Sequence, residues 1–144
     1  MGAYLESGGD ANVKDAAPDK KKILLVDDEP DILLILKKGL EREGGFHVDS
    51  YDDPAMALEN FKPSHYDLIL LDIKMPEMSG FELCGRLRKS DPKARVCFLT
   101  AFESSYHNDT VQQQYFPEIE VDCYIHKPIT IENLLGKVNS MLTK

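Results

Sequence analysis

Short apolar runs separated by amphipathic segments are the feature that most constrains the fold of this chain. Residues 23–26 (ILLV), 67–71 (DLILL) and 95–100 (RVCFLT) are mostly apolar over their whole length. Such runs are typical of strands covered on both faces, because a half-exposed strand would alternate polar and apolar residues. The sequence therefore predicts a sheet with helices on both sides.

The other elements have weaker but recognisable patterns. Two further strands, 46–51 and 121–125, alternate polar and apolar residues, and the helices are expected at 30–43, at about 53–61, from Ser79 onward, within 102–120 and from Thr130 onward. Capping residues or proline mark most of these helix starts. The helix within 102–120 has the weakest periodicity.

Five strands alternating with five helices predict an α/β fold of the (βα)5 type, with a parallel sheet. Because crossovers between parallel strands are right-handed, we expect an open, doubly wound sheet. The expected order is 2-1-3-4-5, as in flavodoxin-like folds. This order is taken from known five-stranded folds of the class rather than derived from the sequence.

Length and charge limit the classes of partner. A chain of 144 residues favours one domain with a substantial core. Its net charge of −8 makes nucleic acids and anionic membranes poor direct partners. Residues 1–20 lack a sustained apolar period and predict a flexible tail, so the domain is expected over 21–144.

The chain has neither a long apolar span nor the apolar core of a signal peptide, which predicts a cytoplasmic protein without membrane contact. The three cysteines, Cys84, Cys97 and Cys123, lack CxxC spacing. In a cytoplasmic chain this pattern predicts buried, reduced thiols.

Polar side chains follow four of the five predicted strands at their carboxyl ends. In chain order they are Asp27, Asp28 and Glu29 after the first strand, Asp72 after the third, Thr100 at the end of the fourth and Lys127 after the fifth. In an open α/β sheet, ligands bind beyond these ends, where the strand order reverses. We therefore expect an acidic cup with a hydroxyl and an amine on its far side.

Clustered carboxylates repel one another unless a cation lies among them. No thiol or imidazole flanks Asp27, Asp28 or Asp72 in the sequence, so a hard cation is expected. Mg²⁺ fits because it uses one or two carboxylates, keeps waters and completes its shell with phosphate oxygens. Each residue alone could lie in a turn or cap a helix, and we expect Glu29 to be a helix cap. Together they predict a site for magnesium and a phosphoryl group.

The motifs LLVDDEP, LLDIKMPEMSG, FLTA and YIHKP stand in this order at the ends of the expected strands. Over residues 21–144 the sequence resembles the receiver domain of two-component response regulators. The resemblance implies that Asp72 is the phosphoacceptor for a sensor histidine kinase or phosphotransfer protein. It also implies Mg²⁺ bound by Asp28, Asp72 and the backbone carbonyl of Lys74, with Asp27 acting mainly through water.

The same resemblance assigns the response to phosphorylation. Thr100 would bond the phosphoryl group, Lys127 would pair with it, and Tyr124 would act as the aromatic switch. The change would reach the face formed by helix 4, strand 5 and helix 5, where an unidentified downstream protein binds. A cis peptide is expected between Lys127 and Pro128. We expect a monomer or weak dimer that catalyses only its own phosphorylation and dephosphorylation and is otherwise no enzyme.

The sequence departs from the family between Thr100 and Lys127, an interval a few residues longer than usual. There, FPEIEVD replaces the small residue and glycine often seen before the last strand. Two positions that control water near the phosphoryl group carry Lys74 and Phe102, neither of which has a carboxylate or carboxamide to orient a water. They predict slow dephosphorylation.

Two other functions remain open from the residues alone. A haloacid-dehalogenase-type phosphatase also uses an Asp nucleophile with Thr and Lys, but it needs DxD after strand 1, where Asp27-Asp28-Glu29 has Glu at the third position. A phosphate-independent interaction module on the same fold would have no physical need for clustered charge.

Overall fold

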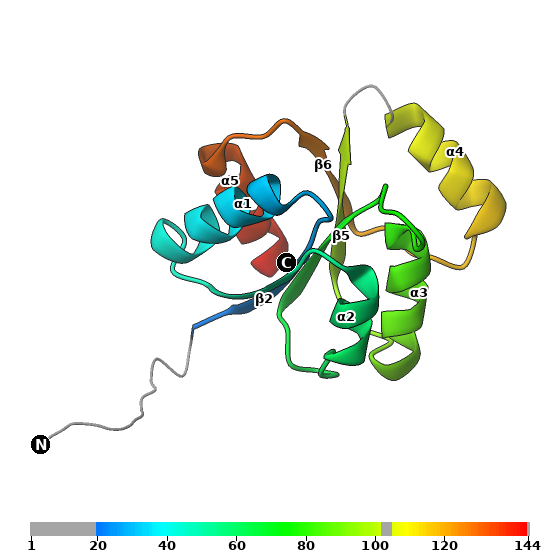
Figure 1. Ribbon diagram of the computed structural model, residues 1–144, viewed down its shortest axis with the longest axis horizontal. Helices are drawn as coiled ribbons and strands as arrows, with labels where there is room; N and C mark the ends of the chain where they lie inside the picture. Colours follow the sequence, from blue (N-terminus) through cyan, green and yellow to red (C-terminus); the bar gives the residue numbers. More distant parts are fainter. Residues whose placement is uncertain (1–19, 102–104, 144) are drawn as a thin grey trace, which may run out of the picture.

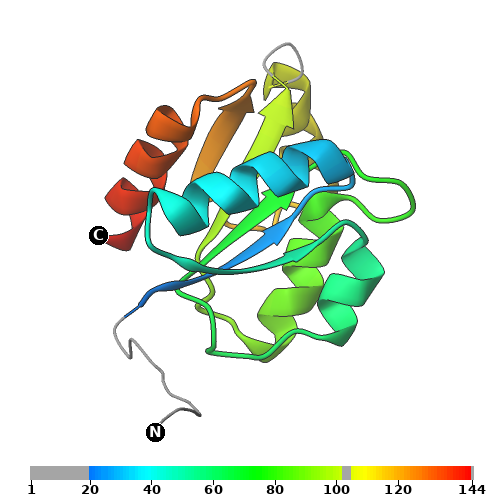
Figure 2. The same cartoon turned by 60° about the vertical axis from the view of Figure 1, so that its left-hand side comes forward.

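The computed structural model describes residues 20–101 and 105–143, which form a five-stranded parallel sheet covered by helices on both faces (Figures 1 and 2). In chain order the elements are β2 (Lys22–Val26), α1 (Pro30–Arg42), β3 (His47–Tyr51), α2 (Pro54–Glu59), β4 (Leu68–Asp72), α3 (Gly80–Ser90), β5 (Val96–Ala101), α4 (Ser105–Tyr115), β6 (Cys123–Lys127) and α5 (Ile131–Leu142). The sheet order is β3-β2-β4-β5-β6. Counted along the chain this is 2-1-3-4-5, so the predicted doubly wound fold is confirmed.

The helices divide between the two faces of the sheet: α1 and α5 cover one face, and α2, α3 and α4 cover the other (Figure 1). Each strand sends alternate side chains into the two layers. In β2, Ile23 and Leu25 join the cluster under α1 and α5, whereas Leu24 and Val26 join the opposite cluster. Burial on both faces is the physical reason for the continuous apolar runs.

Side-chain caps begin three of the helices, as the sequence predicts. Asp53, Ser79 and Thr130 each accept a hydrogen bond from a backbone N–H two or three residues later. These bonds satisfy donors that the first helical turn leaves unpaired. In α1, by contrast, Glu29 occupies the cap position without a side-chain capping bond, and Pro30 begins the helix. The Glu29 carboxylate is therefore available to other partners.

The last strand begins later than the sequence predicts. Alternation of apolar residues predicts a strand over 121–125, but β6 runs from Cys123 to Lys127. The carboxylate of Asp122 explains the shift. It accepts a hydrogen bond from the backbone N–H of Val96 at 2.9 Å and pairs with the Arg88 guanidinium at 3.0 Å. Residue 122 therefore anchors a loop instead of extending the strand.

The prediction of three reduced thiols is wrong for two of the cysteines. Cys97 and Cys123 form a disulfide, whereas Cys84 is free and buried. The two partners are 26 residues apart and stand opposite each other in β5 and β6. Sequence spacing does not reveal such a pair, because only the sheet register brings the residues together.

The predicted tail and the predicted helix within 102–120 include residues that the structure does not describe. The predicted tail over 1–20 lies outside them, apart from Lys20, and so does Phe102. The helix expected within 102–120 is α4, and it is confirmed for Ser105–Tyr115. Among the described residues, no helix is long and apolar enough to cross a membrane.

Candidate functional site

A cavity of about 280 Å³ lies at the carboxyl ends of β2, β4, β5 and β6. In chain order its lining residues are Asp28, Glu29, Asp72, Ile73, Lys74, Leu99, Thr100, Ala101 and Lys127. The chain passes from β3 to β4 across β2, so the strand order reverses beside this cavity. The cavity is therefore at the point of the fold where doubly wound sheets bind ligands.

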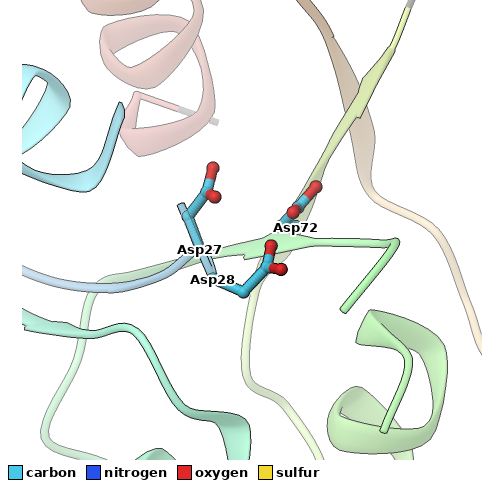
Figure 3. Close-up of side chains that lie close together, drawn as sticks. All are labelled: Asp27, Asp28 and Asp72. Carbon is cyan, nitrogen blue, oxygen red and sulfur yellow. The ribbon is translucent and has the colours of Figure 1, made fainter. Parts of the chain in front are cut away.

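Three carboxylates meet at the edge of this cavity, where Figure 3 shows them converging from two strands. Asp27 and Asp28 directly follow β2, and Asp72 is the last residue of β4. Each offers an oxygen within 4.8 Å of the others. Asp27 is fully buried and Asp72 is only 6% exposed, while Asp28 is half-buried. The cluster is close enough for its charges to interact strongly.

Lys127 is the cation that faces these acids. Its Nζ lies 2.8 Å from Asp27 Oδ2, 3.4 Å from Glu29 Oε1 and 3.5 Å from Asp72 Oδ1. Burial alone would lower the pKa of Lys127, but its hydrogen bond to Asp27 and the charges of Asp72 and Asp27 outweigh burial and raise that pKa. Lys127 is therefore charged at neutral pH, and its Nζ lies close to acids at the ends of both β2 and β4.

Burial raises the pKa of Asp72 to about 7, and the negative charge of Asp27 contributes to the shift, as does contact with Asp28. Lys127 acts in the opposite direction without cancelling it. The ionised cluster is thus destabilised by its own repulsion, since one ammonium faces several carboxylates. A divalent cation would relieve that repulsion. The donor set fits Mg²⁺, because the cluster supplies carboxylate oxygens and the cavity lining contains neither Cys nor His.

Lys74 lies in the loop after β4 and lines the cavity, and the Lys74 side chain is exposed. Gly80 closes this loop by donating its N–H to the carbonyl of Ile73 at 2.9 Å. A Cβ at position 80 would collide with the backbone carbonyl of Asp72. Glycine at this position therefore lets the start of α3 approach the strand that carries Asp72.

Thr100 lies near the end of β5, the strand that pairs with β4, and it lines the cavity. It is 2% exposed, and its hydroxyl donates a hydrogen bond to the carbonyl of Ala101 at 3.3 Å. Ala101 pairs with Lys127 in the sheet register. The predicted hydroxyl and amine are thus brought to neighbouring strand ends, both within the cavity lining.

Tyr124 lies outside the cavity, on β6 and facing the α4 side of the sheet. It is half-buried, with its ring centroid 6.1 Å from that of Phe98. Burial raises the pKa of the Tyr124 phenol, and the nearby Asp109 carboxylate raises it further. No described residue makes a well-aligned hydrogen bond to its buried hydroxyl.

The site has features that local sequence signals do not predict. Glu29, interpreted from sequence as a helix-capping acid, lines the cavity and pairs with Lys127. The sequence does not indicate this pairing, because Glu29 and Lys127 are far apart in the chain. The peptide between Lys127 and Pro128 is cis, as the family resemblance implied.

Comparison with known proteins identifies the family. A family model described as the response regulator receiver domain matches residues 23–139. The response regulator receiver protein CpdR of Brucella abortus is 33% identical over 122 residues, covering 85% of this chain and 97% of CpdR. The transcriptional regulatory protein PrrA of Mycobacterium leprae is 35% identical over 130 residues, which are 90% of this chain but 53% of PrrA. The chain thus spans about half the length of PrrA.

Solved structures agree with this result. A CheY-like response regulator receiver domain protein from Methanospirillum hungatei has a TM-score of 0.72 at 31% identity, covering 87% of this chain and 95% of that one. The response regulator TrrA of Thermotoga maritima, solved with Mg²⁺ and BeF, has a TM-score of 0.69 at 37% identity, covering 84% of this chain and 98% of that one. The chain belongs to the receiver-domain family of two-component response regulators.

Proposed function

We propose that Asp72 of this receiver domain accepts a phosphoryl group from a phosphohistidine on a sensor histidine kinase or phosphotransfer protein. The observation that carries the proposal is the convergence of Asp28, Asp72, Thr100 and Lys127 on one cavity of about 280 Å³. Four separate strand ends supply these groups, which are two carboxylates, a hydroxyl and an amine. A structural role for each residue in isolation would not require them to converge.

In this reaction a carboxylate oxygen of Asp72 attacks the phosphorus in line with the leaving imidazole nitrogen. The P–N bond breaks, an acyl phosphate forms on Asp72, and the imidazole leaves with the bonding pair. Lys127 Nζ, already 3.5 Å from Asp72 Oδ1, is placed to pair with charge on the equatorial oxygens. The ammonium would then exchange part of its contact with Asp27 for the phosphoryl group.

The acidic cluster would hold Mg²⁺ through Asp28, Asp72 and the Lys74 carbonyl, with Asp27 acting mainly through water. When bound, the ion supplies positive charge to the phosphoryl oxygens. The residues of this chain fit that role because Asp28 faces the cavity while Asp27 is fully buried and paired with Lys127. Asp28 is therefore the member of the pair with the better access to a ligand in the cavity.

The response would begin at Thr100, whose hydroxyl donates a hydrogen bond to the carbonyl of Ala101 and would donate to a phosphoryl oxygen instead. Tyr124 would then change position against Phe98 and alter the face formed by α4, β6 and α5. That face is where we place the downstream protein partner. The chain would thus catalyse its own phosphorylation and dephosphorylation and transmit the result through a surface.

The kinase-side partner has a separate candidate surface on α1, the helix that begins two residues after Asp28. Leu34 and Ile35, which are consecutive in this helix, are large apolar residues and are 52% and 57% exposed. Their place on the helix that follows the acidic residues supports docking of a protein rather than of a small phosphate ester.

Mass spectrometry after incubation with a small phosphodonor and Mg²⁺ tests the proposal. We expect one added phosphoryl group that hydroxylamine removes, as it removes acyl phosphates, and we expect no label on Asp72→Asn. Asp31→Asn is the matched control, because Asp31 is an exposed acid on α1 that does not line the cavity. Equal labelling of Asp72→Asn and wild type would show that Asp72 is not the acceptor. Sustained turnover of a chromogenic phosphate ester would favour a phosphatase instead.

A further inference from the structure

Cys97 and Cys123 are placed to form and break a disulfide without rearrangement of the sheet. They are direct partners in the register of β5 and β6, and they are bonded in the structure. Their Cα atoms are 4.5 Å apart, within the usual range for disulfides. The parallel strand pair maintains this separation whether or not the sulfurs are bonded, so both redox states are compatible with the same fold.

We propose that Cys97 and Cys123 form a reversible redox modification site, whose oxidation ties β6 to β5 and restrains the face formed by α4, β6 and α5. The second half of this inference rests on the proposed function, because that face is where phosphorylation at Asp72 would be transmitted. The first half concerns the cysteines alone.

The two sulfurs differ in access. Cys97 is fully buried in the cluster under α5, together with Leu134 and Val138. Cys123 is only partly buried and lies on β6, which is an edge strand of the described sheet and pairs with β5. A reagent therefore reaches Cys123 first, and Cys97 acts as the resolving thiol.

A peroxide is the class of oxidant that this arrangement suits. The Cys123 thiolate attacks one peroxide oxygen, the O–O bond breaks, and Cys123 becomes a sulfenic acid while hydroxide leaves. The Cys97 sulfur then attacks the Cys123 sulfur, the S–O bond breaks, and water leaves with the Cys97 proton. With hydrogen peroxide, two thiols lose two protons and two electrons, and two waters form. A dithiol reductant reverses the step by thiol–disulfide exchange.

The position of the pair connects it with the response machinery. Tyr124 directly follows Cys123 and stands opposite Phe98, the residue after Cys97. The sulfurs face α5 while Tyr124 faces α4, so the covalent link holds the Tyr124 backbone from the opposite side of the sheet. The closed loop 97–123 also contains α4 and the inserted FPEIEVD segment. Oxidation therefore restrains the whole segment that would respond to Thr100.

Cys84 supplies an internal comparison. It is buried and free, and burial raises the pKa of its thiol to about 11. A protonated, shielded thiol is a poor nucleophile. Cys84 is expected to stay reduced under conditions that oxidise the other two residues.

The first test counts thiols in the full chain. The chain is reduced, treated with hydrogen peroxide, denatured and alkylated. We expect the three alkylatable thiols of the reduced chain to fall to one, with Cys97 and Cys123 joined in the peptide map. Cys84→Ala should still form the bond, and Cys123→Ala should not. Retention of all three thiols, or bonding between two chains instead of within one, would overturn the inference.

The second test measures restraint in the oxidised and reduced forms. Hydrogen exchange at Tyr124 and Ile125 should be about tenfold slower in the oxidised form, because its edge strand opens less often. The melting temperature should be about 10 °C higher, since a closed loop reduces the freedom of the unfolded chain. Both differences should vanish in Cys123→Ala, a change at a partly exposed position that the fold tolerates better than one at Cys97. Equal exchange in the two forms would refute the proposed restraint.

The third measurement separates this inference from the proposed function. With a phosphodonor and Mg²⁺, the phosphorylation-dependent change in exchange over α4 should be several-fold smaller in the oxidised form. Asp72→Asn should form the disulfide normally. Failure to phosphorylate in either redox state would count against Asp72 as acceptor and leave the cysteine result intact, whereas an equal response in both forms would overturn the regulatory link.

Discussion

The two halves of the candidate site differ in whether they reach the edge of the sheet. The acidic half consists of Asp27, Asp28 and Asp72, which lie at the ends of β2 and β4. Both strands have a neighbour on each side, and every residue of β4 is buried. The switch half consists of Thr100 on β5, a buried strand with a neighbour on each side, and of Tyr124 and Lys127 on β6. In β6, an edge strand, one of the five residues is buried.

This difference matches the two tasks of a receiver. Stabilising charge on a phosphoryl group requires groups held in place before the reaction, because reorganising them would cost free energy. Reporting the reaction requires a segment that changes its arrangement at low cost, and such segments have few buried contacts. The central strands provide the first property and the sheet edge provides the second. Changes in the acidic half should therefore affect chemistry and global stability, whereas changes in the switch half should act locally.

Asp28→Asn should have the largest effect, because it removes a negative charge that faces the cavity. We expect the rate of phosphorylation by a small donor to fall by about 10²–10³, the usual loss when one electrostatic partner of a transition state is removed. The Mg²⁺-dependent rise in melting temperature should also disappear. Phosphorylation is measured by mass spectrometry and melting by calorimetry, with and without Mg²⁺.

Asp31→Asn is again the control for this change, since it removes the same charge from an exposed position. It should keep the phosphorylation rate within a few-fold of wild type. A Mg²⁺ response in Asp28→Asn equal to that of wild type would show that the ion binds elsewhere.

Gly80→Ala tests how rigid the acidic half is. A Cβ at this position would meet the backbone carbonyl of Asp72, which cannot move aside as a flexible side chain could. We expect a loss of about 2–3 kcal/mol in the free energy of unfolding, measured by urea denaturation.

Gly136→Ala is the matched control, because no atom lies within 4 Å of its added Cβ in α5. It should stabilise the chain by about 0.5–1 kcal/mol through helix propensity. Equal effects of the two changes would mean that the loop after β4 adapts freely.

Asp72→Asn should reveal, through the pH dependence of stability, the cost of burying the Asp72 charge beside Asp27. In the metal-free protein the folded-state pKa of Asp72 is raised from its usual 3.8 to about 7. Between these values the folded state binds a proton that the unfolded state does not, so the unfolding free energy of wild type rises as pH falls from about 7 to about 4. The Asn variant lacks this proton. It should therefore be more stable than wild type by about 1–2 kcal/mol at pH 8, with the difference shrinking as pH falls through 7 and disappearing only near pH 4.

Urea titrations of both chains at several pH values, with a chelator present, give this difference directly. A difference that does not change with pH would mean that Asp72 is not destabilised by its neighbours. Added Mg²⁺ should reduce the difference, since bound ion compensates the ionised cluster.

The same comparison explains which features the sequence could predict. Asp27, Asp28 and Asp72 each directly follow an apolar run, so the run itself places them at a strand end. This signal is local, so it can be recognised from the sequence alone. The start of β6 is different, because Asp122 is removed from the strand by Arg88, which lies 34 residues earlier. The Cys97–Cys123 bond also depends on the sheet register, which no local pattern encodes. The sequence therefore placed the acidic residues at strand ends, the known folds of this class supplied the strand order, and prediction failed where tertiary contacts decide.

Arg88 makes the contacts that anchor the inserted loop to the rest of the domain. Its guanidinium donates hydrogen bonds to the carbonyl of Ala94, to the carbonyl of Glu120 at 2.6 Å and to the Asp122 carboxylate at 3.0 Å. Its side chain is only 15% exposed, so solvent replaces these bonds poorly when they are lost. The Asp122 carboxylate would keep its bond to Val96 but lose its charged partner.

Arg88→Met is therefore expected to have a small and local effect, with a loss of about 1 kcal/mol in the free energy of unfolding. Hydrogen exchange should become faster in the first residues of β6, while β2 and β4 keep wild-type rates, because their bonds open only with the whole domain. Arg86→Met is the matched control. Arg86 is 49% exposed and pairs with Glu82 one helical turn away, an interaction of about 0.3–0.5 kcal/mol. Faster exchange in β4 to the same degree as in β6 would show that the two halves of the site do not open independently, and the division between a fixed acidic half and a movable switch half would then be wrong.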